Sequence, residues 1–160
     1  MPNENVIDPT DARLLAALND EPRATTISLA DKVGLSRNTV QARLAKLEQN
    51  GTLGSFERRI DPAALGYTMN AFIITRVVQR NLAEVARALE AIPEVLEVHG
   101  LSGQADLMVR VVARDADDLY RVAGQILADP GVERTETALV MRELVGYRVA
   151  PLLQRARECL

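Results

Sequence analysis

The stretch TTISLADKVGLSRNTVQARLAKLEQNG at residues 25–51 decides the fold of the first third of the chain. Thr25 can cap a short helix that stops at Gly34, because glycine tolerates the left-handed backbone conformation found just past a helix end. Ser36 can cap a second helix, in which Val40 and two later leucines recur at helical spacing. The stretch therefore predicts two short helices joined by a tight turn.

A further helix is predicted upstream of this stretch. Asp8 suits its N-cap, and Pro9 suits the first helical position, where a missing N–H costs nothing. Leu14 and Leu18 lie one turn apart on an apolar stripe. Three short helices with a glycine turn between the last two are compatible with an ordinary bundle. They are equally compatible with a helix-turn-helix domain that places its last helix in the DNA major groove.

The outward face of the last helix favours DNA binding. When Val40, Leu44 and Leu47 point inward, a rotation of about 100° per residue points small and amide-bearing side chains outward. Amides can pair bidentately with adenine, arginine can reach guanine or phosphate, and small residues allow close approach to the bases. A solvated helix would typically carry more Glu and Lys. The outward residues are Asn38, Ala42, Ala45 and Gln49, flanked by Thr39, Gln41 and Lys46, and the arginine is Arg37.

Positive charge is concentrated beside this helix. The whole chain has 19 basic and 22 acidic residues and a formal charge of −3, so general attraction to nucleic acid is excluded. Between Ser36 and Arg59, however, basic residues outnumber acidic ones. Residues 51–59 are predicted to form a tight turn or wing, where Arg58 and Arg59 can contact phosphates. A solvated loop is the alternative.

Composition limits the class of protein. The chain has 160 residues, enough for one or two small domains, and its 48% hydrophobic and 26% charged residues are ordinary globular proportions. It lacks an apolar run long enough to cross a membrane and a recognisable signal peptide, and its lone Cys159 cannot form an internal disulfide. We therefore expect a cytoplasmic protein without membrane contact. A single histidine excludes the usual nitrogen and sulfur metal sites.

The remaining two thirds of the chain contain an internal repeat of strand, helix and strand. The first copy has an apolar run over 69–78, a predicted capping box at Asn81 and Glu84, and a strand from Val95. The second copy has a strand over 106–113, a helix opened by Asp115 and Asp118, and a strand from Val132. This order predicts an α+β fold of the ferredoxin-like βαββαβ type, with both helices on one face of an antiparallel sheet.

Apolar residues are predicted on both faces of that sheet. Ile73 and Val109 would point to one face, while Phe72, Ile74 and Met108 would point to the other. Because only one face has helices to cover it, the other is expected to be an interface. We expect a homodimer that pairs two sheets and presents two recognition helices to a pseudo-palindromic site in double-stranded DNA.

Several spaced motifs together resemble the Lrp/AsnC (feast/famine) family of transcriptional regulators. In the first third they are Ile7–Asp11, Arg23, Leu29–Ala30, Val33–Ser36, Val40, Arg43–Leu44, Leu47–Glu48 and Gly51. Further along they are Ile60–Pro62, Leu65–Gly66, Gly103–Asp106 and Val132–Thr137. The resemblance covers about residues 6–142 and is specific because the motifs occur in the family's order.

The resemblance implies a division of the chain into domains. It places a winged helix-turn-helix domain at 1–61, a linker at 62–68, and a ferredoxin-like effector-binding and oligomerisation (RAM) domain at 69–143. Residues 144–160 form an extension without an assigned role. Members of the family form dimers and often tetramers or octamers, and they adjust transcription when an amino acid or related metabolite binds. No cofactor besides such an effector is expected.

The resemblance also implies site residues. Base and phosphate contacts would come from Ser36, Arg37, Asn38, Thr39, Gln41, Arg43 and Lys46, with Arg58 and Arg59 beside them. Arg43 lies nearest the buried stripe, so an ion pair within the domain or a phosphate contact is favoured there over base readout. The effector site would comprise Gly100, Leu101, Ser102, Gly103, Gln104, Ala105, Asp106, Thr135 and Thr137.

Chemistry supports the effector loop only in part. A free amino acid needs an acceptor for its ammonium group and N–H donors for its carboxylate, and a glycine-rich turn that ends in Asp106 can supply both. The alternative is that Gly103 to Asp106 only close a β-hairpin. At Ala105 many family members have an aromatic residue instead.

Two other functional classes remain open. Siroheme decarboxylases resemble the same two-domain fold, but they rely on histidine and arginine chemistry. Here the only histidine, His99, is expected to have a structural or surface role, which argues against an enzyme. The other alternative is an effector-binding module whose helical domain does not bind DNA.

Overall fold

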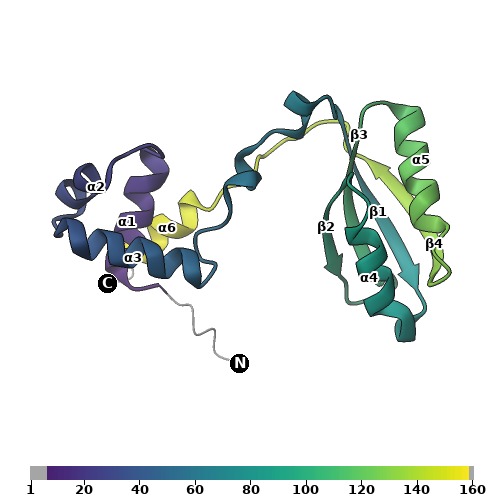
Figure 1. Cartoon of the computed structure of the whole chain (residues 1–160), viewed down its shortest axis with the longest axis horizontal. Helices are drawn as coiled ribbons and strands as arrows, with labels where there is room; N and C mark the ends of the chain where they lie inside the picture. Colours follow the sequence, from purple (N-terminus) through teal and green to yellow (C-terminus); the bar gives the residue numbers. More distant parts are fainter. Residues whose placement is uncertain (1–6, 159–160) are drawn as a thin grey trace. The chain divides into compact units, whose positions relative to one another are not determined.

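The computed structural model describes residues 7–158, apart from the side chains of Arg58 and Glu158. These residues form two compact units (Figure 1). The first unit combines the N-terminal part of the chain, up to Arg58, with the C-terminal part from Val145, and the second unit is Arg59–Leu144. No helix in the described part is long and apolar enough to span a bilayer. The terminal Cys159 lies outside the described residues.

The first unit contains four helices, and the first three start at the predicted caps. They are α1 (Pro9–Asp20), α2 (Thr26–Val33), α3 (Arg37–Gln49) and α6 (Ala150–Glu158). The side chain of Asp8 accepts a hydrogen bond from the Asp11 N–H at 2.7 Å, and Thr25 accepts one from the Ser28 N–H at 3.2 Å. Gly34 ends α2 with φ 70°, a left-handed conformation that favours glycine. The sequence predictions for α1, α2 and α3 are confirmed.

One apolar core joins α1, α2 and α3. It consists of buried Leu14, Leu29, Ala30, Val33 and Val40. These residues come from the three apolar stripes that the sequence predicts, so the helix-turn-helix has a packed interior. After α3 the chain turns at Gly51 and forms two short 3-10 helices, η1 (Phe56–Arg59) and η2 (Pro62–Leu65).

Helix α6, from the extension that sequence analysis leaves unassigned, packs against α1 (Figure 1). Leu153 and Ala156 are its half-buried side chains, whereas Leu152 is 64% exposed. The two residues three apart lie on one helix face, as a packing contact requires. The C-terminal extension is therefore part of the helical unit.

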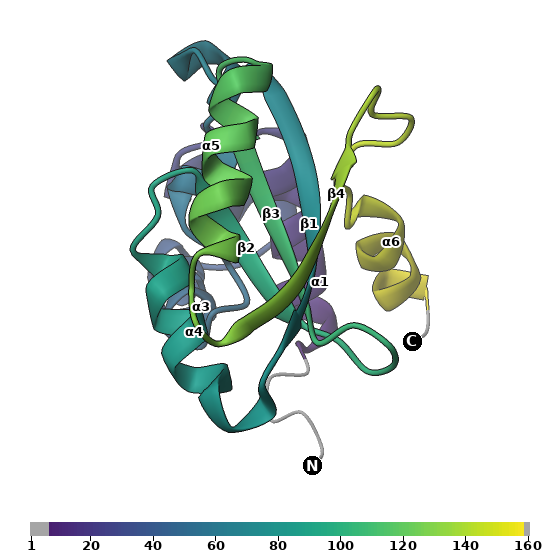
Figure 2. The same cartoon turned by 90° about the vertical axis from the view of Figure 1, so that its right-hand side faces the viewer.

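The second unit is a four-stranded antiparallel sheet with two long helices on one face (Figure 2). Its elements are β1 (Met69–Val77), η3 (Gln79–Asn81), α4 (Leu82–Glu90), β2 (Val95–Gly100), β3 (Leu107–Ala113), α5 (Ala116–Leu127) and β4 (Val132–Leu139). The strand order is β2-β3-β1-β4, so the two central strands come from the beginnings of the two repeats. The predicted ferredoxin-like fold is confirmed.

The helix-covered face of this sheet holds the larger core. Ile73 of β1 and Val109 of β3 are fully buried and pair directly across the strands. Val85 of α4 and Val122 of α5 are also fully buried and belong to the same cluster. The alternation of buried and half-buried residues along β1 follows the period of two expected for a strand with one covered face.

The open face is less apolar than the sequence analysis expects. Phe72, Ile74 and Met108 are half-buried and form its apolar part. Phe72, however, pairs with Arg110 on β3, and Ile74 pairs with Glu136 on β4. The expectation of two apolar faces therefore needs correction. On the open face, Arg110 and Glu136 of the neighbouring strands lie beside a central apolar strip.

One predicted cap is absent. The side chain of Asn81 makes no capping hydrogen bond, so the predicted capping box with Glu84 does not form. Residues 79–81 form η3, and Asn81 has φ −100° and ψ 2° instead of the extended geometry of a capping residue. At the other helix Asp115 accepts a hydrogen bond from the Asp118 N–H at 2.8 Å, as predicted.

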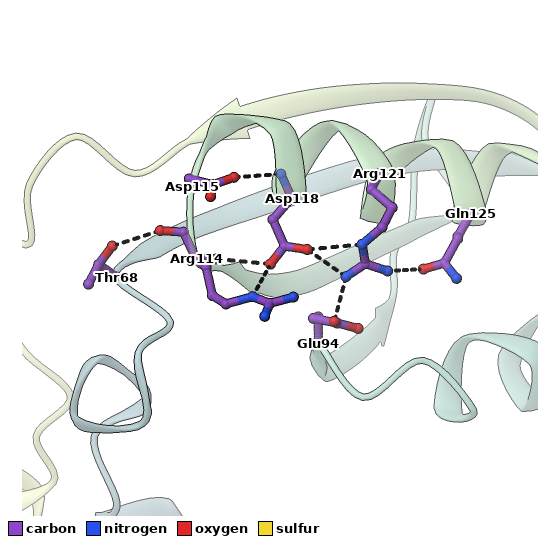
Figure 3. A network of polar contacts seen from close by, with 7 residues as sticks. All are labelled: Thr68, Glu94, Arg114, Asp115, Asp118, Arg121 and Gln125. Atoms are coloured by element: carbon purple, nitrogen blue, oxygen red, sulfur yellow. Dashed lines mark hydrogen bonds and ion pairs between the residues drawn. The ribbon is translucent and has the colours of Figure 1, made fainter.

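A polar network holds the start of α5 to its surroundings (Figure 3). One oxygen of Asp118 accepts hydrogen bonds from the N–H and Nε of Arg114, at 3.0 and 3.2 Å, and the other accepts from Nε and Nη2 of Arg121. Arg121 also donates to Glu94 at 2.5 Å and to Gln125 at 2.8 Å. The backbone hydrogen bond from Arg114, followed by the two guanidinium groups, lowers the pKa of Asp118 far below its usual range.

Candidate nucleic-acid interface and effector loop

The predicted reading face of α3 is open to solvent. Arg37, Asn38, Thr39, Gln41 and Lys46 are all exposed, while Val40 and Leu47 of the same helix are buried. The helix therefore has the orientation that its apolar spacing predicts. Ala42 and Ala45, also exposed, have short side chains at the centre of this face. Short side chains there allow the helix to approach the edges of the bases closely.

Two hydroxyls organise the first turn of α3. Ser36 Oγ accepts a hydrogen bond from the Thr39 N–H at 3.1 Å, and the two hydroxyls lie 2.8 Å apart. These contacts fix the first turn without using the remaining N–H groups at the helix start. Such exposed N–H groups, together with the positive end of the helix dipole, suit a phosphate.

Arg43 is tied to α1. Its Nη1 donates to Asp8 Oδ2 at 2.6 Å and to Asp11 Oδ1 at 2.7 Å. The hydrogen bond that Arg43 donates lowers the pKa of Asp8, and the hydrogen bonds that Arg43 donates to Asp8 and Asp11 raise the pKa of Arg43. The ion pair within the domain that the sequence favours is thus present. The inclusion of Arg43 among the DNA contacts is correspondingly weakened, because this guanidinium fastens α3 to α1.

A shallow hollow of about 550 Å³ lies beside the reading face. It brings together residues from the start of α1 and from two turns of α3. Its lining residues are Asp8, Asn38, Thr39, Ala42, Arg43 and Lys46. Four of the residues predicted to contact DNA are therefore neighbours in space. Five predicted residues do not line the hollow: Ser36, Arg37 and Gln41 are exposed at the start of α3, Arg59 is exposed at the end of η1, and the side chain of Arg58 lies outside the described residues.

The predicted effector loop connects β2 to β3. Residues 100–104 are exposed, and Gly103 has φ 123°, which a residue with a side chain adopts only with strain. The loop is closed by the Leu101 N–H, which donates to the Asp106 carbonyl at 2.8 Å, and by the Asp106 N–H, which donates to the Thr75 carbonyl at 3.0 Å. Within the described chain, the N–H groups of residues 102–105 donate to no protein acceptor.

Asp106 has a structural role that the sequence analysis gave only as the alternative. Its Oδ2 accepts a hydrogen bond from the Val77 N–H at 2.9 Å, and its Oδ1 accepts one from Gln79 Nε2 at 2.5 Å. The carbonyl of Gln104 is also occupied, by Nε and Nη2 of Arg76 at 3.2 and 2.8 Å. Sequence reasoning missed Arg76, Val77 and Gln79, because the first two lie at the far end of β1 and Gln79 begins η3 just after it, so only the strand register brings them to the loop.

The two threonines of the predicted effector site lie at different distances from the loop between β2 and β3. Thr135 pairs with Thr75, whose carbonyl accepts the Asp106 N–H, so the register places Thr135 near the loop. Thr137 pairs with Ile73, two residues further along the strand. The structure therefore joins Thr135 to the loop more closely than Thr137.

The single histidine lies on the surface. His99 is exposed on β2, with Nε2 3.7 Å from Glu97 Oε2. Among the described residues, no group of three or more His, Cys, Asp or Glu side chains is arranged to hold a metal ion. The surface role expected for His99 agrees with this position.

Comparison with known proteins gives a consistent result for both units. Residues 70–150 match the family model of the Lrp/AsnC ligand binding domain, and residues 7–53 match that of a winged helix-turn-helix DNA-binding domain. The chain is 32% identical to HTH-type transcriptional regulator FL11 of Pyrococcus horikoshii, over 85% of this chain and 90% of that protein.

Solved structures are similar over nearly the whole chain. AsnC of E. coli superposes with a TM-score of 0.80 at 26% identity, covering 91% of this chain and 99% of its own. The leucine response regulatory protein of Mycobacterium tuberculosis superposes with a TM-score of 0.78 at 27% identity, covering 89% and 98%.

Proposed function

The chain belongs to the Lrp/AsnC family of DNA-binding transcriptional regulators, and on this premise we propose how it performs that function. A homodimer binds a two-fold DNA site through its two α3 helices, and an amino acid or related small metabolite bound by the second unit changes the occupancy of that site. The observation that carries the proposal is the exposed, amide-bearing face of α3 on a capped and packed helix.

The roles on α3 follow from chemistry. Asn38 and Gln41 are exposed and can each make two hydrogen bonds to the edge of adenine in the major groove. Arg37 and Lys46 are placed to contact guanine or phosphate, and Ser36 and Thr39 to contact phosphate at the helix start. Arg43 positions the helix through Asp8 and Asp11.

The dimer is proposed to form through the open face of the sheet. Phe72, Ile74 and Met108 would otherwise leave an apolar strip uncovered, and a second copy of the same strip is its natural partner in a closed two-fold assembly. Such a dimer presents two α3 helices, as two half-sites of a pseudo-palindrome require. Further assembly into tetramers or octamers, which the family often shows, is part of this proposal.

The effector is proposed to bind beside the loop between β2 and β3. The match to a ligand binding domain and the name of the leucine response regulatory protein support an amino acid. The N–H groups of residues 102–105 have no protein acceptor and can receive a carboxylate. Asp106 is not needed for the ammonium group in this proposal, because its oxygens already bind Val77 and Gln79.

The direct test is binding of the purified protein to DNA from upstream of its own gene. Binding would be measured by fluorescence anisotropy across a salt series, with and without a mixture of free amino acids, against a scrambled DNA of equal length. We expect selective binding that the amino acids change. Equal affinity for both DNAs at every salt concentration would contradict the proposal. A Soret band in the purified protein would favour tetrapyrrole chemistry instead.

A further inference from the structure

Two arginines lie directly opposite each other at one end of the sheet. Arg76, near the end of β1, pairs across the strands with Arg134, near the start of β4, and both residues are exposed. They belong to the open face, because Ile74, two residues before Arg76 on the same strand, lies on that face. Like charges at directly opposite positions of an antiparallel pair are destabilising, so an anion bound by both guanidinium groups would relieve the repulsion.

The chain itself supplies no anion to Arg134. Within residues 7–158, the Arg134 side chain forms no hydrogen bond and no ion pair. Glu136 is the next charged residue of β4 on the same face, but it lies opposite Ile74 and forms no ion pair with Arg134. The forked donors of Arg134 are therefore available to a ligand.

Arg76 joins this arginine pair to the predicted effector loop. Its Nε and Nη2 donate to the Gln104 carbonyl at 3.2 and 2.8 Å, so the guanidinium lies against the loop between β2 and β3. The strand register agrees, because Thr75 pairs with Leu107 on one side and with Thr135 on the other. The end of β1, the start of β4 and the loop therefore meet at one end of the sheet (Figure 2).

Hydrogen-bond donors are in excess at this end of the sheet. Within the described chain, the N–H groups of residues 102–105 have no protein acceptor, and neither has the guanidinium of Arg134. The carboxylate of Asp106 and the carbonyl of Gln104 already accept hydrogen bonds from other groups of the chain. A surface that combines free N–H groups with two guanidinium groups suits a ligand that carries two anionic groups.

We propose that the effector is a small dicarboxylate and that Arg134, together with Arg76, binds its second carboxylate. The inference rests on the proposed function, because it takes the loop between β2 and β3 as the effector site. The first carboxylate accepts hydrogen bonds from the loop N–H groups, and the second is bound by guanidinium groups, whose forked donors match a carboxylate. Acidic amino acids and dicarboxylic acids without an ammonium group share this chemistry. Arg134 is then a specificity-determining residue that selects the acid over the neutral amide of the same shape.

The test compares acidic ligands with neutral ones of the same shape. L-Glutamate, L-glutamine, L-aspartate, L-asparagine, 2-oxoglutarate and succinate are each titrated into the full chain by isothermal titration calorimetry at constant ionic strength. We expect at least one acid to bind about tenfold more tightly than its amide, because the amide loses charge-assisted hydrogen bonds. The compound that binds most tightly should also change the binding of DNA from upstream of the gene.

The same titrations distinguish the two sources of a dicarboxylate. Tighter binding of glutamate or aspartate than of 2-oxoglutarate and succinate identifies an acidic amino acid, whose ammonium group adds to the affinity. Tighter binding of 2-oxoglutarate or succinate identifies a dicarboxylic acid without that group. Either result supports the inference.

Matched substitutions assign the preference to Arg134. Arg134→Gln removes the cation and should reduce the preference for the acid to about twofold or less. Arg134→Lys keeps the charge without the forked donors and should give an intermediate preference. Arg87→Gln removes an exposed arginine of α4, which lies on the helix-covered side of the sheet, and should keep the wild-type preference. Because removal of Arg134 relieves its repulsion with Arg76, ligand-free Arg134→Gln should unfold at no lower urea concentration than the wild type.

Three results would overturn the inference. Equal binding of acids and amides, or an unchanged preference in Arg134→Gln, would exclude the dicarboxylate while leaving a regulator that responds to another amino acid. Selective DNA binding that none of these compounds and no other amino acid changes would also overturn the effector part of the proposed function. A lower mass of Arg134→Gln in light scattering would assign Arg134 to the contact between two copies of the chain instead of to a ligand.

Discussion

Arg43 lies on α3, the proposed DNA-reading helix, yet its guanidinium hydrogen-bonds two carboxylates at the start of α1. Arg43→Gln removes this link and leaves Asp11, which is 10% exposed at its side chain, without its cation. We expect the free energy of unfolding to fall by about 1 to 2 kcal/mol, measured by urea denaturation followed by circular dichroism. Arg37→Gln, at an exposed position of the same helix, is the control. Unchanged stability with a smaller salt dependence of DNA binding would instead make Arg43 a phosphate contact.

Asp106 gives a second prediction, because its two oxygens close the loop between β2 and β3 from within the chain. In Asp106→Asn one of the two acceptors becomes a donor that faces Gln79 or the Val77 N–H. We expect the free energy of unfolding to fall by about 1 to 3 kcal/mol, because a hydrogen bond to a charged group is lost. If Asp106→Asn keeps the full stability of the wild type but loses the response to amino acids, Asp106 binds the ammonium group of the effector instead.

Asp118 makes stability depend on pH. Because hydrogen bonds lower its pKa in the folded chain, its contribution is complete above the pKa of the unfolded chain, about 3.9, and is lost as the pH falls toward the folded value. Asp118→Asn should therefore be less stable than the wild type at pH 7, and the difference should shrink below about pH 4. Thermal unfolding from pH 7 to pH 2, with exposed Asp117→Asn as control, measures it. A difference that stays constant with pH would contradict the assignment.

At the scale of the element, the reading face of α3 carries a prediction about specificity. Asn38→Ala and Gln41→Ala each remove an exposed amide and should relax the preference for one base pair, costing about 1 to 3 kcal/mol on the matched site. Gln49→Ala removes an exposed amide from the last position of the same helix and should change little. Competition binding against single-base variants of the site measures the effect. Unchanged discrimination would exclude both residues from base readout.

The elements that sequence predicts well are those whose cause is local. Ser36 caps α3 through the N–H three residues along, and Gly34 ends α2 through its own backbone freedom, so both can be inferred from a few neighbours. Asn81 has the right residue type for a cap, but η3 runs into α4 and leaves no extended residue there. The local sequence pattern does not predict that η3 continues directly into α4.

Contacts between residues far apart in the sequence limit how much of the candidate sites can be predicted. The orientation of α3 follows from its apolar stripe, so its exposed residues could be predicted. The oxygens of Asp106, by contrast, meet Val77 and Gln79 only because β1 and β3 pair in one register. Residues 144–160 have no role that can be assigned from sequence, because α1, the partner of helix α6, lies more than a hundred residues away along the chain.

At the scale of the whole molecule, adjacent residues of β1 allow folding and the proposed assembly to be tested separately. Ile73 is fully buried under the helices, whereas Ile74 is half-buried on the open face of the sheet. Ile73→Asp places a charge in the core, where burial without a partner is costly, and should unfold the second unit. Ile74→Asp leaves that core intact and should yield a folded monomer, because it places a charge in the proposed apolar interface.

Light scattering and circular dichroism distinguish the two outcomes. We expect Ile74→Asp to keep the helix and strand content of the wild type while its mass falls to that of one chain. Because a monomer presents one α3, its affinity for a two-half-site DNA should drop toward that for a single half-site. A wild type that is already monomeric, or an Ile74→Asp variant that remains dimeric, would place the interface elsewhere. In that case the open face, on which Arg110 and Glu136 lie beside the apolar strip, would be a solvated surface.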